Sequence, residues 1–386
     1  MEHLRIGIVC YPTYGGSGVI ATELGMALAK QGHKIHFITH RRPARLSSFL
    51  ENVFFHEVST MEYPLFEHQP YETALASKLV DVVKYEKLDV LHVHYAIPHA
   101  SAAFLAKKIL EEQGIMIPYI TTLHGTDITL VGTDRSYAPV VEFSINQSDG
   151  VTAVSNSLRQ ETLDNFKIDK DIHVIYNFID FDRFKKNNKE HFKKLIAPEG
   201  EKILIHTSNF RKVKRVDDVI RIFYLVNREI PSKLLLVGDG PERTAMEGMC
   251  RKLGLCDDIR FLGKQEAIEE ILSISDLFLI PSEKESFGLA ALEAMACEVP
   301  VISSNTGGLT EVNNHGKTGY VSNVGNVDEM ASYAIHLLKN EALLQEMREN
   351  ALAQAKTFSI ERILPKYESL YRQVIREHQP KPVIEQ

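Results

Sequence analysis

Two glutamates, Glu285 and Glu293, stand seven residues apart around a predicted helix start. The loop that holds the first of them follows an apolar run typical of a buried strand. The first backbone N–H groups of a helix lack partners within the helix and carry a partial positive charge, so this point is a favourable seat for a diphosphate. The residues at the helix start are Ser286, Phe287, Gly288 and Leu289. We therefore expect a phosphate-containing ligand here, with one carboxylate toward a sugar and the other toward a nucleoside.

A basic segment follows another predicted strand, at residues 201–207, and offers further groups for phosphate. Arg211 and Lys214 lie just after this strand, and Asn209 precedes them. Lysine and arginine neutralise phosphate oxygens and donate hydrogen bonds to them. The position favours a phosphate clamp, and the alternative is a solvated basic patch.

A glycine-rich loop, residues 15–18, follows the first predicted strand and precedes a predicted helix over 19–31. Strand, glycine loop, helix and strand in this order open a doubly wound sheet. Glycine has no Cβ, so Gly16 allows a close approach of backbone to ligand. The spacing is not G-x-G-x-x-G, and no acid follows the second strand to bind a ribose, which argues against a nicotinamide cofactor.

Polar residues collect where two further strands are expected to end. The run 89–95 ends in His94 and Tyr95, and we expect the strand beginning at Pro118 to end at Thr121 and Thr122. Open α/β sheets bind ligands at the carboxyl ends of their strands. His92 and His94 share a strand face with His99 nearby, but no acid or cysteine completes a metal site locally. His124 follows directly and is a further candidate for ligand contact.

Composition limits the remaining classes. The chain has 386 residues, 44% hydrophobic and 25% charged, with a formal net charge of −7. These values fit two or three globular domains and argue against a general nucleic-acid surface. Four cysteines without paired spacing indicate reduced thiols. No apolar run reaches the roughly 20 residues of a membrane span, and we see no signal peptide, so we expect a cytoplasmic protein without stable membrane insertion.

The segment Glu-Ser-Phe-Gly-Leu-Ala-Ala-Leu-Glu, residues 285–293, resembles the signature of the family-four retaining glycosyltransferases. The resemblance implies the GT-B fold, with two Rossmann-like doubly wound α/β domains facing across a cleft. The expected domains are an acceptor domain over 1–178, a linker over 179–200 and a nucleotide-sugar domain over 201–357. A helix over about 358–378 is expected to return to the first domain.

The resemblance also implies residue roles. Glu285 and His124 would lie at the donor sugar, Glu293 would bind the ribose, and Lys214 matches a family lysine at the diphosphate. The family arginine that pairs with this lysine is replaced by Asn209, and Arg211 is the candidate substitute. The implied donor-binding set is Gly16, Asn209, Arg211, Lys214, Gly263, Ser286, Phe287, Gly288, Leu289 and Glu293. Of these groups, Glu285, His124 and Lys214 are the expected catalytic ones, and no general base is assigned.

Further segments, among them residues 94–99, 121–129 and 208–216, resemble family members that move N-acetylglucosamine from UDP-N-acetylglucosamine to L-malate in the first step of bacillithiol biosynthesis. The configuration at the sugar would be retained, with no metal or other cofactor. We expect acceptor contacts from Ser17, Tyr95, Thr121 and Thr122, while Arg45, Lys78 and Arg135 are unranked candidates for the malate carboxylates. The alternatives are an inositol-phosphate or lipid acceptor, or a non-catalytic sugar-nucleotide binding protein, and homo-oligomer formation stays open.

Overall fold

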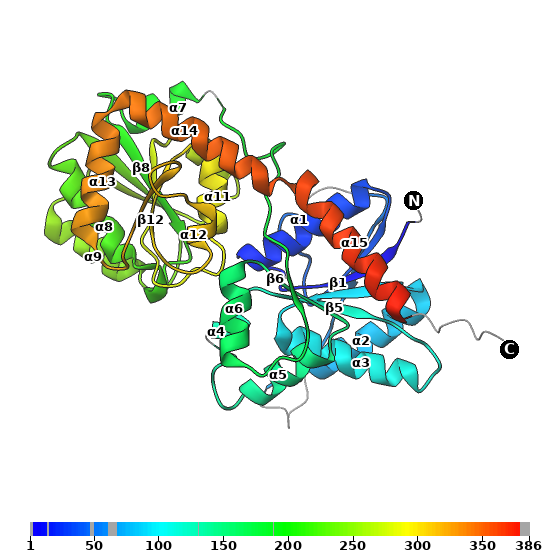
Figure 1. Ribbon diagram of the computed structural model, residues 1–386. Helices are drawn as coiled ribbons and strands as arrows, with labels where there is room; N and C mark the ends of the chain where they lie inside the picture. The colour runs from blue at the N-terminus through cyan, green and yellow to red at the C-terminus, as the bar shows by residue number, and fades with distance from the viewer. Residues whose placement is uncertain are drawn as a thin grey trace. The chain divides into compact units, whose positions relative to one another are not determined.

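The computed structural model describes residues 3–13, 15–46, 50–60, 68–129, 131–187 and 189–378. The chain forms two compact units (Figure 1). The first comprises residues 1–177 together with 360–386, and the second comprises residues 178–359. Each is built on a parallel sheet, in agreement with the two Rossmann-like domains expected from the sequence.

The sheet of the first unit has seven strands in the order β3-β2-β1-β4-β5-β6-β7. Its strands are β1 (Arg5–Val9), β2 (Lys34–Thr39), β3 (Val53–Glu57), β4 (Val90–His94), β5 (Tyr119–Leu123), β6 (Gly150–Ala153) and β7 (Ile172–Val174). Ile6 of β1 lies opposite Ile35 on one side and Val90 on the other. Because all neighbours run parallel, the loops that follow the strands emerge at one edge of the sheet.

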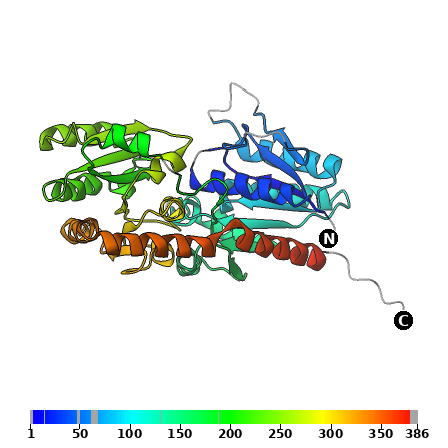
Figure 2. The same ribbon diagram turned by 90° about the horizontal axis from the view of Figure 1, so that it is seen from above.

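Helices cover both faces of this sheet, as its apolar strands require. They are α1 (Gly16–Lys30), α2 (Tyr71–Glu86), the π-helical turn η1 (Ala96–Ala100), α3 (Ser101–Glu111), α4 (Thr126–Thr129), α5 (Ala138–Gln147), α6 (Asn156–Asn165) and α15 (Ile360–His378). α2 and α3 enclose a core with β1, β2 and β4. α1 and α15 lie together on the other face, as Figures 1 and 2 show.

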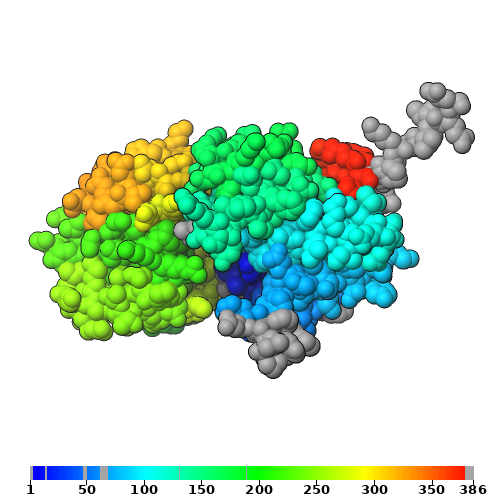
Figure 3. All heavy atoms as spheres, turned by 90° about the horizontal axis from the view of Figure 1, so that it is seen from below, coloured from blue at the N-terminus to red at the C-terminus, as the bar shows by residue number. Residues whose placement is uncertain are grey.

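Helix α15 comes from the end of the described chain and is part of the first unit's core. Its apolar residues Ile363, Leu364, Tyr367, Tyr371 and Val374 are buried. Figure 3 shows its last turns at the surface, where His378 Nδ1 lies 3.6 Å from Asp149 Oδ1. The first unit therefore combines segments from both ends of the sequence.

The second unit holds a six-stranded sheet in the order β10-β9-β8-β11-β12-β13. Its strands are β8 (Lys202–Ser208), β9 (Ser232–Gly238), β10 (Ile259–Gly263), β11 (Leu277–Ile280), β12 (Val301–Ser304) and β13 (Gly319–Ser322). Numbered within the unit, this is the order 3-2-1-4-5-6 of the doubly wound fold, and the first six strands of the other sheet follow the same order. Two chain halves without an evident sequence repeat thus share one topology.

Helices again flank this sheet. They are α7 (Glu190–Ile196), the 3₁₀ turn η2 (Lys212–Lys214), α8 (Val216–Asn227), α9 (Arg243–Leu253), α10 (Ile268–Ser273), α11 (Leu289–Ala296), α12 (Leu309–Val312), α13 (Val327–Lys339), α14 (Glu341–Ala355) and η3 (Lys356–Phe358). One core is enclosed by α8, α9, α13 and the start of α14. α11 packs against β11, β12 and α14.

Residues 179–200, which we expected to form a linker, are grouped with the second unit. Arg183 binds Glu269 at 3.2 Å, and Lys193 binds the buried Asp276 at 3.1 Å. These ion pairs attach the segment to the second unit, at α10 and at the residue before β11, so it does not behave as a free connection.

Candidate active site

The strand order of each sheet reverses between its first and fourth strands. In the second unit these are β8 and β11, and in the first unit they are β1 and β4. The loops after two such strands run apart in opposite directions, which leaves room for a ligand between them. The residues predicted from sequence to bind ligands are concentrated on these loops.

Lys214 and Glu285 meet at the reversal point of the second unit. Lys214, in the loop after β8, donates a hydrogen bond from Nζ to Oε1 of Glu285, in the loop after β11, at 2.5 Å. The buried Ser282 donates to the same carboxylate oxygen at 3.0 Å. Both charged side chains keep partial exposure, so the pair is held in place and is still accessible.

A glycine turn between β12 and α12 supports the Glu285 loop. The Gly308 N–H donates to the Glu285 carbonyl at 3.0 Å. A Cβ at Gly307 would lie 2.0 Å from that carbonyl oxygen, and one at Gly308 would lie 2.5 Å from Phe287 Cα. Only glycines allow this approach of two backbones. No local sequence pattern shows that this turn packs on the signature loop.

Gly288 begins helix α11 with φ 96°, a left-handed conformation that glycine adopts without strain. Its Cα lies against Leu309, because an added Cβ would be 2.5 Å from that side chain. The predicted strand, loop and helix order is confirmed, and Ser286 and Leu289 flank the helix start. Phe287 is buried and packs edge-on against Phe358 at 5.6 Å, so its side chain anchors the loop in the core.

Glu293 lies inside α11 on its buried side, with 9% of its surface exposed. Helix α11 is otherwise made of small and apolar residues that pack closely. The negative charge of Glu293 raises the pKa of the Cys297 thiol, although burial of that thiol is the larger cause. A carboxylate placed so deeply in an apolar helix is typical of a functional group and unusual for a solvated surface.

The loop after β8 carries further basic residues near Lys214. Arg211 is exposed and forms no ion pair with any residue in the described part of the chain, which leaves its guanidinium available to an anion. Asn209 is also exposed, and Gly240 packs against its carbonyl, where a Cβ would lie at 2.0 Å. Arg215, in contrast, binds the buried Asp218 at 2.6 Å and serves the fold.

Gly263 ends β10 with φ 67° and is half-buried. The pairing with β9 shifts register between Phe261 and Gly263, so the backbone departs from the regular ladder there. Backbone N–H and C=O groups at the end of this strand are therefore the groups that Gly263 offers to a donor.

Ser17 and Tyr95 meet at the reversal point of the first unit. The Tyr95 hydroxyl donates to Ser17 Oγ at 2.7 Å, which joins the turn after β4 to the first turn of α1. Gly16, the first residue of α1, is exposed beside this pair. Tyr95 has φ 88°, a conformation that costs an aromatic residue roughly 1–3 kcal/mol. Burial raises the pKa of its hydroxyl, so Tyr95 is a neutral donor.

His124 follows β5 and lies beside Tyr95, with ring centroids 5.2 Å apart. Burial of the imidazole lowers the pKa of His124 to about 3, so the ring is neutral near pH 7. Asp127 shapes its loop by accepting from the backbone N–H groups of Ala96 and Gly125, both at 3.0 Å. Asp127 therefore ties the loop after β5 to the turn after β4.

Two buried histidines continue inward from His124. His94 Nδ1 lies 2.8 Å from His124 Nε2, and the His92 ring stacks on His94 at 4.4 Å. His92 in turn contacts the Tyr371 hydroxyl of α15 at 2.8 Å. Burial lowers the pKa of His92 to about 3 and that of His94 well below its usual value. These rings are core groups that support His124.

The expectation that β5 ends at Thr121 and Thr122 was wrong, because the strand continues to Leu123. Both threonines are fully buried. Thr121 Oγ1 binds Ser148 at 2.7 Å, and Thr122 Oγ1 binds His92 at 2.7 Å and Thr152 at 2.6 Å. Their hydroxyls are satisfied within the core and have no access to an acceptor.

The three candidate cations for an acidic acceptor differ in availability. Arg45 is bound to Glu23 at 2.5 Å. Lys78 is half-buried on α2, where its charge lowers the pKa of His56, although burial of that imidazole is the larger cause. Arg135 is exposed and has no ion pair within the described ranges. Arg135 is therefore a better candidate than Arg45 for binding an acidic acceptor, because the charge of Arg45 is already balanced by Glu23.

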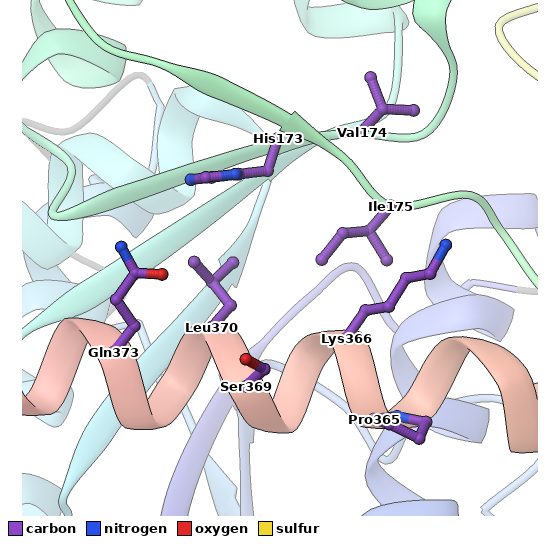
Figure 4. A pocket seen from close by; sticks show the side chains of 8 residues that line it. All are labelled: His173, Val174, Ile175, Pro365, Lys366, Ser369, Leu370 and Gln373. Carbon is purple, nitrogen blue, oxygen red and sulfur yellow. The ribbon is translucent and has the colours of Figure 1, made fainter.

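A separate cavity of about 450 Å³ lies in the first unit between β7 and α15 (Figure 4). Its lining residues are His173, Val174, Ile175, Pro365, Lys366, Ser369, Leu370 and Gln373. None of the predicted site residues is among them, so this cavity is separate from the reversal points. Sequence reasoning overlooked Ser282 and Tyr11, whose ring lies 5.4 Å from that of Tyr95.

Two family models match the chain, one in each half and without overlap. Residues 14–183 match Glycosyltransferase Family 4, and residues 187–354 match the Glycosyl transferases group 1 model. The N-acetyl-alpha-D-glucosaminyl L-malate synthase of Bacillus anthracis is 50% identical over 376 residues, covering 97% of this chain and 98% of that protein. The chain belongs to the family-four glycosyltransferases, and it is an enzyme of the sugar-transferring class.

Other similar proteins are more distant. The D-inositol 3-phosphate glycosyltransferase of Jonesia denitrificans is 23% identical over 379 residues, covering 89% of this chain and 88% of that protein. Among solved structures, Anabaena HepE in complex with UDP and glucose has a TM-score of 0.82 at 19% identity, covering 96% of this chain and 100% of that one. Sucrose-phosphate synthase from Thermosynechococcus elongatus has a TM-score of 0.81 at 20% identity, covering 97% and 100%. The GT-B fold is thereby shown. No helix in the described ranges is long and apolar enough to cross a membrane.

Proposed function

We propose that this enzyme transfers N-acetylglucosamine from UDP-N-acetylglucosamine to the hydroxyl group of L-malate, with retention of the α configuration. The observation that carries the proposal is the 50% identity to the malate synthase over 97% of the chain. The paired loops at the two reversal points supply groups of the right chemistry, with cations on the second unit and hydroxyl donors on the first.

In this proposal the second unit binds the donor. Backbone N–H groups from Ser286 to Leu289, together with Lys214 and Arg211, receive the negative charge that grows on the departing diphosphate. Fixed donors and cations of this kind stabilise a transition state because they need no rearrangement as charge develops. Glu285 orients the sugar and keeps Lys214 in place, while Glu293 accepts from the ribose hydroxyls.

The first unit binds the acceptor. Ser17 and Tyr95 offer hydroxyl groups to L-malate, and His124, as a neutral imidazole, contacts the sugar. No protein base is assigned, because the departing phosphate can take the proton of the attacking hydroxyl on the same face of the sugar. Lys214, Arg211 and the start of helix α11 can balance the charge of the diphosphate without a metal ion, so we propose a metal-independent reaction.

The test is an acceptor screen with the purified chain and UDP-N-acetylglucosamine, following UDP release and the mass of the product. L-Malate is compared with D-malate, L-lactate and inositol 3-phosphate, each with and without EDTA. We expect UDP release and a glycosylated product with L-malate, unchanged by EDTA. Transfer to inositol 3-phosphate alone would replace the acceptor assignment, and UDP binding without transfer to any acceptor would contradict catalysis.

A further inference from the structure

Two histidines and a glutamate converge on the first unit, outside the contacts described above. They are His36 on β2, His56 on β3 and Glu86, the last residue of α2. One ligand atom from each lies within 4.8 Å of the ligand atoms of the other two. His36 Nδ1 and His56 Nε2 are 3.0 Å apart, and the two rings stack at 5.2 Å.

The fold explains why these three side chains meet. In the register of β2 and β3, His36 lies opposite Phe54 and Ile38 lies opposite His56. Side chains two residues apart share a face of a strand, so both imidazoles point to the same side of the sheet. Ile38 packs there with apolar residues of α2, which places the end of that helix, and Glu86, beside the pair.

The geometry is close to that of a metal site. Tetrahedral Zn²⁺ with bonds of about 2.0–2.1 Å to nitrogen needs ligand atoms about 3.3 Å apart. The two imidazole nitrogens share a hydrogen bond at 3.0 Å, so an ion that replaces the proton between them needs them to separate by only about 0.3 Å. His36 is 1% exposed, and its other nitrogen, Nε2, has no hydrogen-bond partner in the described part of the chain.

We propose that His36, His56 and Glu86 bind a divalent transition-metal ion, with Zn²⁺ the best match and water as the fourth ligand. Two imidazole nitrogens favour Zn²⁺ over Mg²⁺ or Ca²⁺, which prefer oxygen ligands. The basic groups Arg5, Lys34 and Lys78 act on the two histidines and oppose a cation there, whereas the carboxylate of Glu86 acts on His56 in the opposite sense. The bound ion joins the edge strand β3 to β2 and α2.

The experiment measures metal binding by the full chain and does not depend on transferase activity. The protein is stripped with a chelator, dialysed against ZnCl₂, washed on a desalting column and analysed by mass spectrometry for zinc. The variants are His56→Gln and Glu86→Gln, and the matched control is His173→Gln, an exposed histidine on β7 of the same unit. Circular dichroism verifies the fold of each protein, and Co²⁺ serves as a second probe through its visible absorption in tetrahedral sites.

We expect one retained Zn²⁺ per chain in the wild type and in His173→Gln, and tetrahedral Co²⁺ absorption in both. Each ligand variant should bind Zn²⁺ at least about tenfold more weakly, since even the loss of outer-shell partners costs about 10–100-fold. Wild-type protein that retains no stoichiometric Zn²⁺ overturns the proposal. Equal retention by His56→Gln or Glu86→Gln overturns it as well, because the ion then lies elsewhere.

Discussion

Lys214 Nζ lies 2.5 Å from Glu285 Oε1 and joins the loops after β8 and β11, the two strands at which the second sheet reverses its order. The first unit has a similar contact between two neutral groups. Tyr95, just after β4, donates a hydrogen bond to Ser17, which lies in the first turn of the helix after β1. Ion pairs are common at protein surfaces, but one placed at the reversal point of a doubly wound sheet lies where such folds bind ligands. We expect the charged pair to serve the anionic donor and the hydroxyl pair to serve the acceptor.

Replacing Lys214 should slow sugar transfer much more than it destabilises the protein. Removal of one group that stabilises developing charge typically costs about 10²–10³-fold in kcat, so we expect a loss of that order for Lys214→Met. Lys212→Met is the matched control, because Lys212 is an exposed lysine in the same turn. Steady-state kinetics with UDP-N-acetylglucosamine and L-malate measure both. Equal rates in the two variants would remove Lys214 from the reaction.

A methyl group at Gly307 should damage the donor site. Its Cβ would lie 2.0 Å from the Glu285 carbonyl oxygen, so the signature loop must move. Gly316→Ala is the control, since Gly316 also has a positive φ, 75° against 50°, but nothing lies within 4 Å of its Cβ. We expect UDP affinity, measured by calorimetry, to fall at least about tenfold only in Gly307→Ala. A similar fall in both variants would show that backbone strain, and not the crowding, is responsible.

Removal of the Tyr95 hydroxyl should weaken binding of the acceptor and leave that of the donor unchanged. A hydrogen bond of this kind contributes about 0.5–1.5 kcal/mol, so Tyr95→Phe should raise the KM for L-malate by about 2–12-fold. Tyr85→Phe, at a ring that is 79% exposed on α2, is the control. A rise in the KM for UDP-N-acetylglucosamine with no change for L-malate would reverse the assignment.

Glu293 should act on nucleotide binding. Hydrogen bonds to a charged group are worth about 1.5–3 kcal/mol, so Glu293→Gln should raise the KM for the donor by about 10–100-fold with a smaller effect on kcat. The control is Glu283→Gln, an exposed glutamate in the loop before α11. Thermal melting of both variants verifies the fold. An unchanged donor KM would place the ribose elsewhere.

The buried histidines should make the protein less stable in acid. The pKa values of His92 and His124 fall to about 3 and that of His99 to about 4, against 6.5 in the unfolded chain. Between about pH 4 and 6.5 the unfolded chain therefore binds more protons, and stability rises with pH by about 1.4 kcal/mol per pH unit for each such histidine. Burial raises the pKa of the Asp127 carboxyl group to about 6, so this one group has the opposite effect on stability over the same pH range.

We therefore expect a lower melting temperature at pH 5 than at pH 7, measured in buffers of equal ionic strength. An unchanged or higher melting temperature at pH 5 would show that the rings accept protons in the folded protein. The Asp127→Asn variant should show a steeper dependence, because it removes the opposing group.

Local patterns in the sequence predicted much of this structure. The signature around Glu285 and Glu293 and the basic loop after β8 lie where strand and helix periodicity placed them, whereas helix α1 begins at Gly16, inside the predicted glycine loop at residues 15–18. These features depend on neighbours in the sequence, and short-range geometry governs them. The alternation of strands and helices indicated a doubly wound sheet, and the resemblance to the family-four signature implied the pair of such domains.

Contacts between distant segments were not predictable in this way. Alternation within β5 does not distinguish a ligand-facing threonine from a buried one, because helices cover both faces of a parallel sheet. Thr121 and Thr122 were misplaced for this reason. The contact of His92 with Tyr371 spans 279 positions, and no local pattern encodes it.

Helix α15 has a consequence for the order in which the chain matures during translation. The first unit emerges from the ribosome early, but its core needs Tyr367 and Tyr371, which are synthesised only after residues 178–359. At roughly 5–20 residues per second, this interval lasts about 10–40 s. The second unit is continuous in sequence, so it can fold first. Until α15 has been made, the first unit lacks part of its core, and the apolar residues that α15 covers are accessible to chaperones.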